Sequence, residues 1–296
     1  MQLRQSCVSL KTFNPKFKVL TVAGILAGIL ALAGCGGNAM IHSSLPPVTQ
    51  TTAAPAPAPP ASSPTPAPPP ATGVSIPASA QIYGNIQQQD GWQWCTQKLN
   101  GSVCAAGVGK AISWMAPHQT TPSLDGSSAQ FFIGGSTGYS NALWWRSLGA
   151  NSAASHFVYD VWFYLDDAAA AQALEFDANQ TFGGTRWVFG TECNINGTHH
   201  WAVWDGVKGA WISSSIACHP FPAKTWVHLI WNFERVNDKV HYVSVVLNGI
   251  ASPVDMYLGA QKNYAGDDVS VAFQMDGNFR QQNYSTWLDK LTLSAW

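Results

Sequence analysis

The stretch from residue 173 to residue 180 reads Ala173-Leu174-Glu175-Phe176-Asp177-Ala178-Asn179-Gln180. Apolar and polar side chains alternate along it, and successive side chains of a β-strand point to opposite faces of a sheet. The alternation therefore predicts a strand whose apolar side chains face a core. Glu175, Asp177 and Asn179 then share the opposite face, which is wholly polar.

Other short segments have a similar character and are separated by turn residues. They are Ala129–Ile133, Phe157–Leu165, Arg186–Gly190, Trp201–Trp204, Trp226–Arg235, Lys239–Leu247, Val269–Asp276 and Thr286–Leu293. The pair Asn248-Gly249 favours a two-residue hairpin turn. No long amphipathic helix pattern is present. We therefore expect an all-β domain built from two packed antiparallel sheets.

The same alternation selects a candidate binding face. It places Trp162, Gln274 and Asp276 opposite the apolar sides of their own strands. We expect one concave face to take part in ligand binding through Glu175, Asp177, Asn179, Trp162, Gln274 and Asp276. Carboxylates and amides bind sugar hydroxyls, and an aromatic ring stacks on the C–H side of a pyranose. The alternative is that the outward carboxylates are simply solvated.

The stretch 173–180 resembles the concanavalin A-like lectin/glucanase superfamily, and the late segment Trp226-Val227-His228-Leu229 looks like that superfamily too. The resemblance extends over residues 85–296. It implies a curved two-sheet jelly-roll sandwich that binds or cleaves glycans.

The departures from the superfamily pattern bear on catalysis. By resemblance to the glucanase branch, Glu175 would be the nucleophile and Asp177 its helper. The position of the general acid/base is taken by Asn179 or Gln180. A side-chain amide cannot donate a proton as a general acid does. A retaining glycosidase needs two carboxyl groups about 5–5.5 Å apart. The second carboxyl would have to come from elsewhere, with Asp276 or Asp160 as candidates.

The lectin branch implies a calcium ion and a transition metal near this strand. Calcium takes six to eight oxygen ligands. The chain offers two or three, because residues 181–188 contain no Asp or His. We therefore expect no metal site and no cofactor, with calcium as the open alternative.

The N-terminal region predicts export. Basic residues precede an apolar run, residues 19–33, that is too short for a spanning helix. The run ends in Leu32-Ala33-Gly34-Cys35, which resembles the lipobox of bacterial lipoproteins. It implies a signal peptide over residues 1–34, cleavage before Cys35 and lipidation of that residue. Gly36, rather than Asp, favours the outer membrane if the host has two membranes.

Composition divides the remaining chain into a spacer and a domain. Residues 45–77 hold 12 of the 18 prolines and none of the 14 tryptophans, so residues 35–78 are expected to form a disordered tether. Residues 79–296 carry 11 Lys and Arg against 16 Asp and Glu, a net charge of −5. A mildly acidic domain without basic runs argues against nucleic acid. We expect a monomer whose only membrane contact is the lipid.

Four cysteines lie in this domain, and an even number in an exported domain favours disulfides. We prefer Cys95–Cys104 and Cys193–Cys218 among the three possible pairings, because each closes a short loop. A zinc site is the alternative, but the chain lacks a CxxC spacing.

Together these features favour a non-catalytic, lectin-like lipoprotein that binds a poly- or oligosaccharide at the cell envelope. One alternative is a glycan-cleaving enzyme, a glycoside hydrolase or lyase, that uses Glu175 and Asp177. A second alternative is a surface module that binds protein.

The anchor is tested by Cys35→Ser. This variant should still be exported, but it should move from the detergent phase to the aqueous phase in a phase-partition experiment, because it carries no acyl chain. A variant that stayed with the detergent like the wild type would show that Cys35 is not the anchor.

Overall fold

The computed structural model describes residues 75–96, 110–219 and 221–296, and almost all regular structure in this part of the chain is β-strand. One short 3-10 helix, η1, spans Ile86–Gln88. The earlier strands are β1 (Gln81–Tyr83), β2 (Gln93–Cys95), β3 (Ile112–Gln119), β4 (Ser128–Gly134), β5 (Asn141–Gly149), β6 (His156–Leu165), β7 (Ala171–Phe182) and β8 (Thr185–Phe189). The later strands are β9 (Thr191–Cys193), β10 (His200–Asp205), β11 (Ala210–Ala217), β12 (Trp226–Val236), β13 (Lys239–Leu247), β14 (Ile250–Gly259), β15 (Gln261–Lys262), β16 (Asp268–Gly277) and β17 (Tyr284–Ala295).

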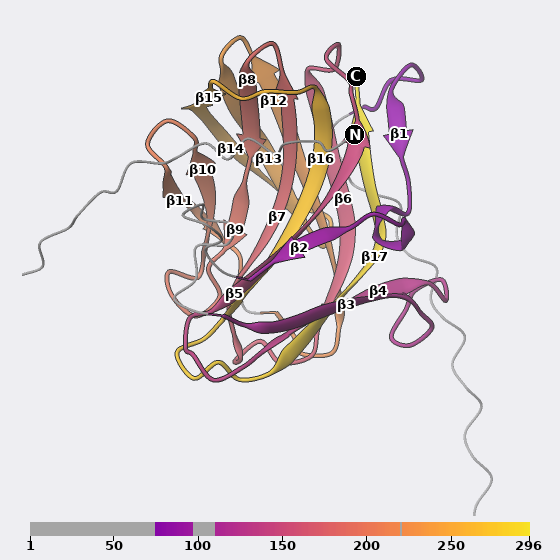
Figure 1. Cartoon of the computed structure of the whole chain (residues 1–296), viewed down its shortest axis with the longest axis vertical. Coiled ribbons are helices and arrows are strands. Elements are labelled where there is room, and N and C mark those ends of the chain that lie inside the picture. Colours follow the sequence, from indigo (N-terminus) through magenta and orange to yellow (C-terminus); the bar gives the residue numbers. More distant parts are fainter. Residues whose placement is uncertain (1–74, 97–109, 220) are drawn as a thin grey trace, which may run out of the picture. The chain divides into compact units, whose positions relative to one another are not determined.

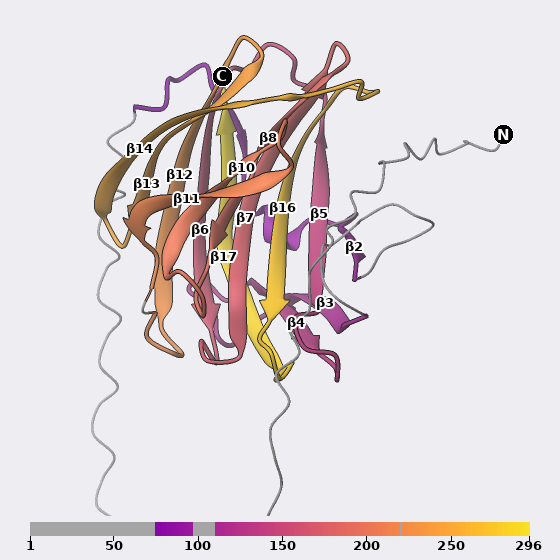
Figure 2. The ribbon, with the colours of Figure 1, turned by 90° about the vertical axis from the view of Figure 1, so that its left-hand side faces the viewer.

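The strands form two antiparallel sheets (Figures 1 and 2). The eight-stranded sheet has the order β14-β13-β12-β6-β17-β4-β3, with β1 paired to β17. The nine-stranded sheet has the order β11-β10-β9-β7-β16-β5-β2, with β8 paired to β7 and β15 paired to β8. The predicted fold class, a sandwich of two antiparallel sheets, is confirmed.

Aromatic side chains from the two sheets meet in the core. Phe163 of β6 lies 5.2 Å from Phe176 of β7, measured between ring centroids, and each ring is fully buried. The rings of Phe131 on β4 and Phe273 on β16 are 5.0 Å apart. Full burial of such side chains contributes roughly 1.5–3 kcal/mol each. The core therefore supplies the force that holds one sheet on the other.

Each segment expected to be a strand overlaps a strand of the structure. The predicted turn at Asn248-Gly249 joins β13 to β14, and both residues have positive φ angles, 48° and 81°, as a two-residue hairpin turn requires. Strand β5 and several edge strands such as β14 were not predicted from the sequence. The alternation in β14 is interrupted by Pro253, which is tolerated at the edge of a sheet.

The predicted Cys193–Cys218 disulfide is present and joins the end of β9 to the residue that follows β11. Both cysteines are buried. Cys104, Cys35 and residues 35–74 of the Pro-rich spacer lie outside the described residues, so the Cys95–Cys104 pair and the lipid anchor stay predictions. Within the described residues no helix is both long and apolar enough to cross a membrane.

The disulfide closes a loop of 25 residues. Replacing both Cys193 and Cys218 with Ala should lower the free energy of unfolding by about 3 kcal/mol, because the unfolded chain gains entropy. Equilibrium denaturation measures the loss, and in excess reductant, where neither protein keeps a disulfide, the difference between wild type and variant should disappear. Equal stability of the two oxidised proteins would contradict the expectation.

Candidate functional site

Five of the six predicted binding residues lie on the outer face of the nine-stranded sheet. Glu175, Asp177 and Asn179 are on β7, and their neighbours in the strand, such as Phe176, point into the core. Gln274 and Asp276 follow the same alternation on the adjacent strand β16. Glu175 stands directly opposite Gln274 in the antiparallel register. The structure thus brings these five side chains together as predicted.

Trp162 is not on this face, so the expectation that it joins the cluster is wrong. It lies on β6 of the eight-stranded sheet and stacks on His228 with 4.4 Å between ring centroids. Asp160, considered as a second catalytic carboxyl, is on the same strand and accepts a 2.7 Å hydrogen bond from His228. Strand alternation placed both side chains outward correctly, but it does not say to which sheet a strand belongs.

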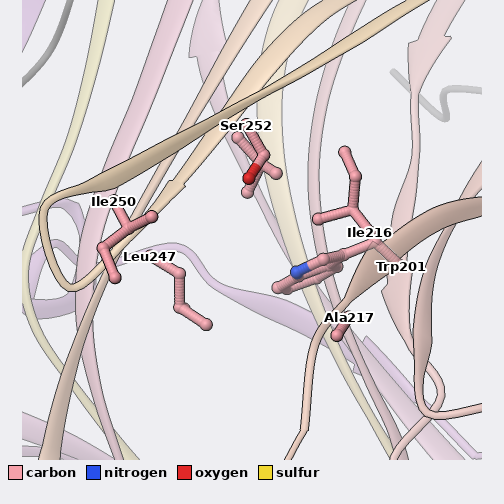
Figure 3. Close-up of a pocket in the computed structure, with 7 residues that line it drawn as sticks. Trp201, Ile216, Ala217, Leu247, Ile250 and Ser252 are labelled. Atoms are coloured by element: carbon pink, nitrogen blue, oxygen red, sulfur yellow. The ribbon is translucent and has the colours of Figure 1, made fainter.

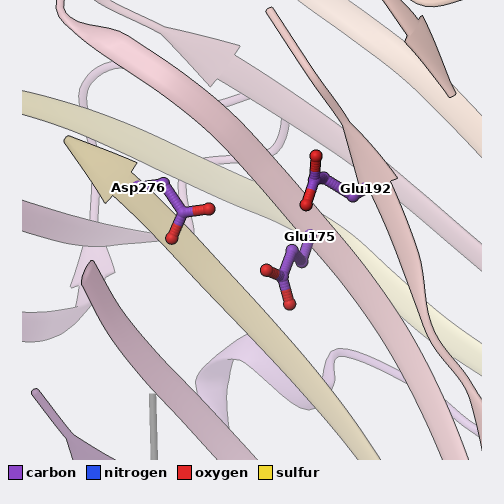
Figure 4. A group of neighbouring side chains, drawn as sticks. All are labelled: Glu175, Glu192 and Asp276. Carbon is purple, nitrogen blue, oxygen red and sulfur yellow. The ribbon is translucent and has the colours of Figure 1, made fainter. Parts of the chain in front are cut away.

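The structure adds Glu192, which the sequence analysis missed. Glu192 is on β9, directly opposite Glu175 in the β7–β9 register. Figure 4 shows the carboxyl groups of Glu175, Glu192 and Asp276 turned toward one another from three strands. One oxygen of each lies within 4.8 Å of the others. The three-residue strand β9 is too short for alternation to reveal it, so no pattern marked Glu192 beforehand.

Amide groups hold the carboxyl cluster in place. The Gln274 side-chain N–H group donates to Glu175 and, at 3.0 Å, to Asp276. Asn194 donates to Glu192 at 3.0 Å, and the backbone N–H of Thr191 donates to Asp177 at 2.9 Å. Each carboxyl thus has at least one donor, and the arrangement is pre-organised.

Asn179 marks the far end of the row along β7. Its side-chain Oδ1 is buried and has no hydrogen-bond partner among the described residues. A buried acceptor without a partner is costly. This acceptor is therefore free to bind a ligand N–H or O–H group.

Burial raises the pKa of every carboxyl in the cluster. For Glu175 the pKa is raised well above its ordinary value, first by burial and then by the charges of Asp276, Asp177 and Glu192. Burial, followed by the charge of Glu192, raises the pKa of Asp276 to about 7. Burial also raises the pKa of Asp177 to about 7, against the opposing hydrogen bond from Thr191.

The pKa of Glu192 is likewise raised by burial, and the hydrogen bond from Asn194 opposes the shift. The carboxyl groups of Glu175, Glu192 and Asp276, whose oxygens lie within 4.8 Å of one another, cannot all ionise without a counter-charge. The cluster therefore holds protons near neutral pH, or it holds a cation. A protonated carboxyl beside an ionised one suits acid–base chemistry, and three convergent carboxylates suit a divalent ion such as calcium.

Tryptophans flank the carboxyl cluster on both sides. Trp145 on β5 and Asp177 on β7 are the two cross-strand neighbours of Ala272, so all three share one row of the outer face. Trp204 on β10 packs edge-to-face on Trp211 of β11, with 5.2 Å between ring centroids. These three tryptophans are partly exposed. The outer face thus combines a central polar row with an aromatic border.

No protein-family model matches the chain, and no curated protein matches it either. Solved structures with a similar architecture include a carbohydrate esterase from the Shiga toxin-encoding bacteriophage phi24B, at 13% identity and a TM-score of 0.40, covering 73% of this chain and 99% of that one. Arcelin-5, a lectin-like defence protein from Phaseolus vulgaris, has 10% identity and a TM-score of 0.41, and the match covers 74% of this chain and 99% of arcelin-5. Lectin I from Ulex europaeus has 9% identity and a TM-score of 0.40, and the match covers 69% of this chain and 98% of the lectin.

The raised pKa values predict how stability depends on pH. The folded state binds protons that the unfolded state has already lost, so the free energy of unfolding should fall as the pH rises from about 4 through about 7. Asp276→Asn should flatten this decline and make the protein more stable at pH 8 by on the order of 2 kcal/mol.

Denaturation at a series of pH values measures both effects, and Asp90→Asn, at an exposed carboxyl, is the matched control. The control should follow the wild-type curve. A wild type whose stability did not change between pH 4 and pH 8 would show that the cluster does not hold extra protons.

Proposed function

We propose that this chain binds carbohydrate on the outer face of the nine-stranded sheet, as a lectin-like module tethered to the cell envelope through Cys35. The observation that carries the proposal is the polar row of β7, β9 and β16 with tryptophans on both sides. Carboxylates and amides bind vicinal hydroxyls, and partly exposed tryptophans stack on the apolar face of a pyranose.

The exposure of the side chains in this site also suits a sugar. Glu175, Asp177 and Glu192 are nearly buried, whereas Asp276 and Trp145 remain partly exposed. A ligand therefore reaches the carboxyl cluster along its aromatic border. The polar groups are already oriented by their neighbours, so binding orders few side chains and loses little affinity to conformational entropy.

A second candidate function is glycan cleavage, and the position of Glu192 favours it. The sequence offered Asp276 or Asp160 as the second carboxyl for Glu175. In the structure Glu192 and Asp276 both stand within 4.8 Å of it, oxygen to oxygen. A glycoside hydrolase needs a protonated carboxyl to assist the leaving group and an ionised one to attack or to activate water. Glu175, with its raised pKa, would be the acid, and Asp276 or Glu192 would be the second group.

A glycan array probed with the full chain tests the binding proposal, and Trp145→Ala and Trp162→Ala are matched variants. Both tryptophans are partly exposed, but they lie on different sheets. Trp145→Ala should weaken binding about 10-fold or more, as loss of a stacked aromatic does, and Trp162→Ala should leave it unchanged. Equal losses in the two variants would place the ligand elsewhere.

The same glycans distinguish binding from cleavage. An enzyme releases new reducing ends from a bound glycan and loses that release in Glu175→Gln, while a lectin binds without turnover. A chain that neither bound nor cleaved any glycan would point to a protein partner instead.

A further inference from the structure

A cavity of about 200 Å³ lies between the edges of the two sheets, away from the outer face that carries the carboxyl cluster (Figure 3). Strands β10 and β11 of the nine-stranded sheet form one wall, and strands β13 and β14 of the eight-stranded sheet form the other. The lining residues are Trp201, Ile216, Ala217, Val245, Leu247, Ile250 and Ser252.

The indole of Trp201 gives this cavity a buried donor. Trp201 is fully buried, and its ring packs edge-to-face on Trp231 with 5.3 Å between centroids. Its Nε1–H group has no hydrogen-bond partner among the described residues. Figure 3 shows the indole nitrogen on the edge of the ring that faces into the cavity, toward Leu247. A buried donor without a partner destabilises the protein unless something in the cavity accepts its hydrogen bond.

The rest of the lining defines the chemistry of an occupant. No lining side chain is charged, and Ser252 is the other side chain with a polar atom. A dry apolar cavity of about 150 Å³ is known to take benzene. A cavity of about 200 Å³ therefore has room for one benzene ring with a short substituent. The lining excludes a charged ligand and favours an apolar ring that carries one acceptor.

The walls are fixed by covalent and backbone bonds. Cys193 stands opposite Trp201 in the β9–β10 register, and its disulfide partner Cys218 directly follows Ala217. On the other wall, Leu247 pairs with Ile250 across the hairpin, and Ile250 is 73% exposed at the rim. The cavity is thus held between two fixed walls and is open on the side of Ile250, and a ligand has to displace a lining side chain slightly to reach the buried Trp201 Nε1–H group.

We propose that this cavity is a second binding site, which takes a small uncharged aromatic compound whose acceptor oxygen receives a hydrogen bond from Trp201 Nε1–H. The site is separate from the proposed glycan face, because Trp201 points between the sheets whereas Ala202 and Glu192 point outward. The proposal for this cavity is therefore independent of the proposal that the outer face binds carbohydrate.

Acetophenone tests the proposal, with α-methylstyrene as a ligand of the same shape that lacks the oxygen. In the full chain labelled with ¹⁵N at tryptophan, acetophenone should shift the Trp201 indole resonance downfield in a saturable way. The Trp231 indole, which is also buried without a partner, should not shift in this way. α-Methylstyrene should bind roughly 2- to 12-fold more weakly, the loss expected for one neutral hydrogen bond.

Two variants check the location without disturbing the core. Ala217→Phe fills the cavity from an exposed lining position and should abolish acetophenone binding. Ala251→Phe, at an exposed alanine that does not line the cavity, should bind like the wild type. The proposal is overturned if acetophenone leaves the Trp201 resonance unmoved, if Ala217→Phe still binds, or if the ligand without oxygen binds equally well.

Discussion

The antiparallel register between β7 and β16 is the constraint on which both the core and the site depend. It sets Phe176 opposite Phe273 on the inner face and Glu175 opposite Gln274 on the outer face. A slip of one residue would turn the carboxyls of β7 into the core, where an unpaired charge is far more costly than a lost apolar contact. Burial of the phenylalanines therefore fixes the position of the carboxyls.

That constraint forces like charges together on the outer face. Once β9 pairs with β7, Glu192 has no position other than opposite Glu175, and repulsion between them cannot be relieved by moving a strand. Hydrogen-bond donors and raised carboxyl pKa values offset this repulsion. Gln274 donates to two carboxyls at once, and the pKa of Asp276 rises to about 7. A ligand that brings hydroxyl groups or positive charge would relieve the same repulsion.

The outer face of the eight-stranded sheet shows how differently carboxylates behave with histidine neighbours. Asp160 accepts a hydrogen bond from His228, and His241 lies between Glu234 and Asp255 at 3.0 Å from each. There each of these acids has a histidine beside it, whereas on the nine-stranded sheet Glu175, Glu192 and Asp276 lie beside one another. The two sheets have similar architecture, so the difference in chemistry comes from which residue types the register places side by side.

The sequence by itself determined the inward and outward faces of the central strands and the all-β class, and it favoured the Cys193–Cys218 pair among three possible pairings. These properties are local: alternation has a period of two residues, and a loop of 25 residues closes easily. It could not tell that Trp162 belongs to the sheet opposite Glu175, that Glu192 completes the carboxyl cluster, or that Trp201 borders a cavity. Those facts depend on which strands become neighbours, and that choice is made when residues far apart in the chain pack into one core. Only the tertiary structure decides it, because many strand orders satisfy the same alternation, and burial of the whole core selects among them.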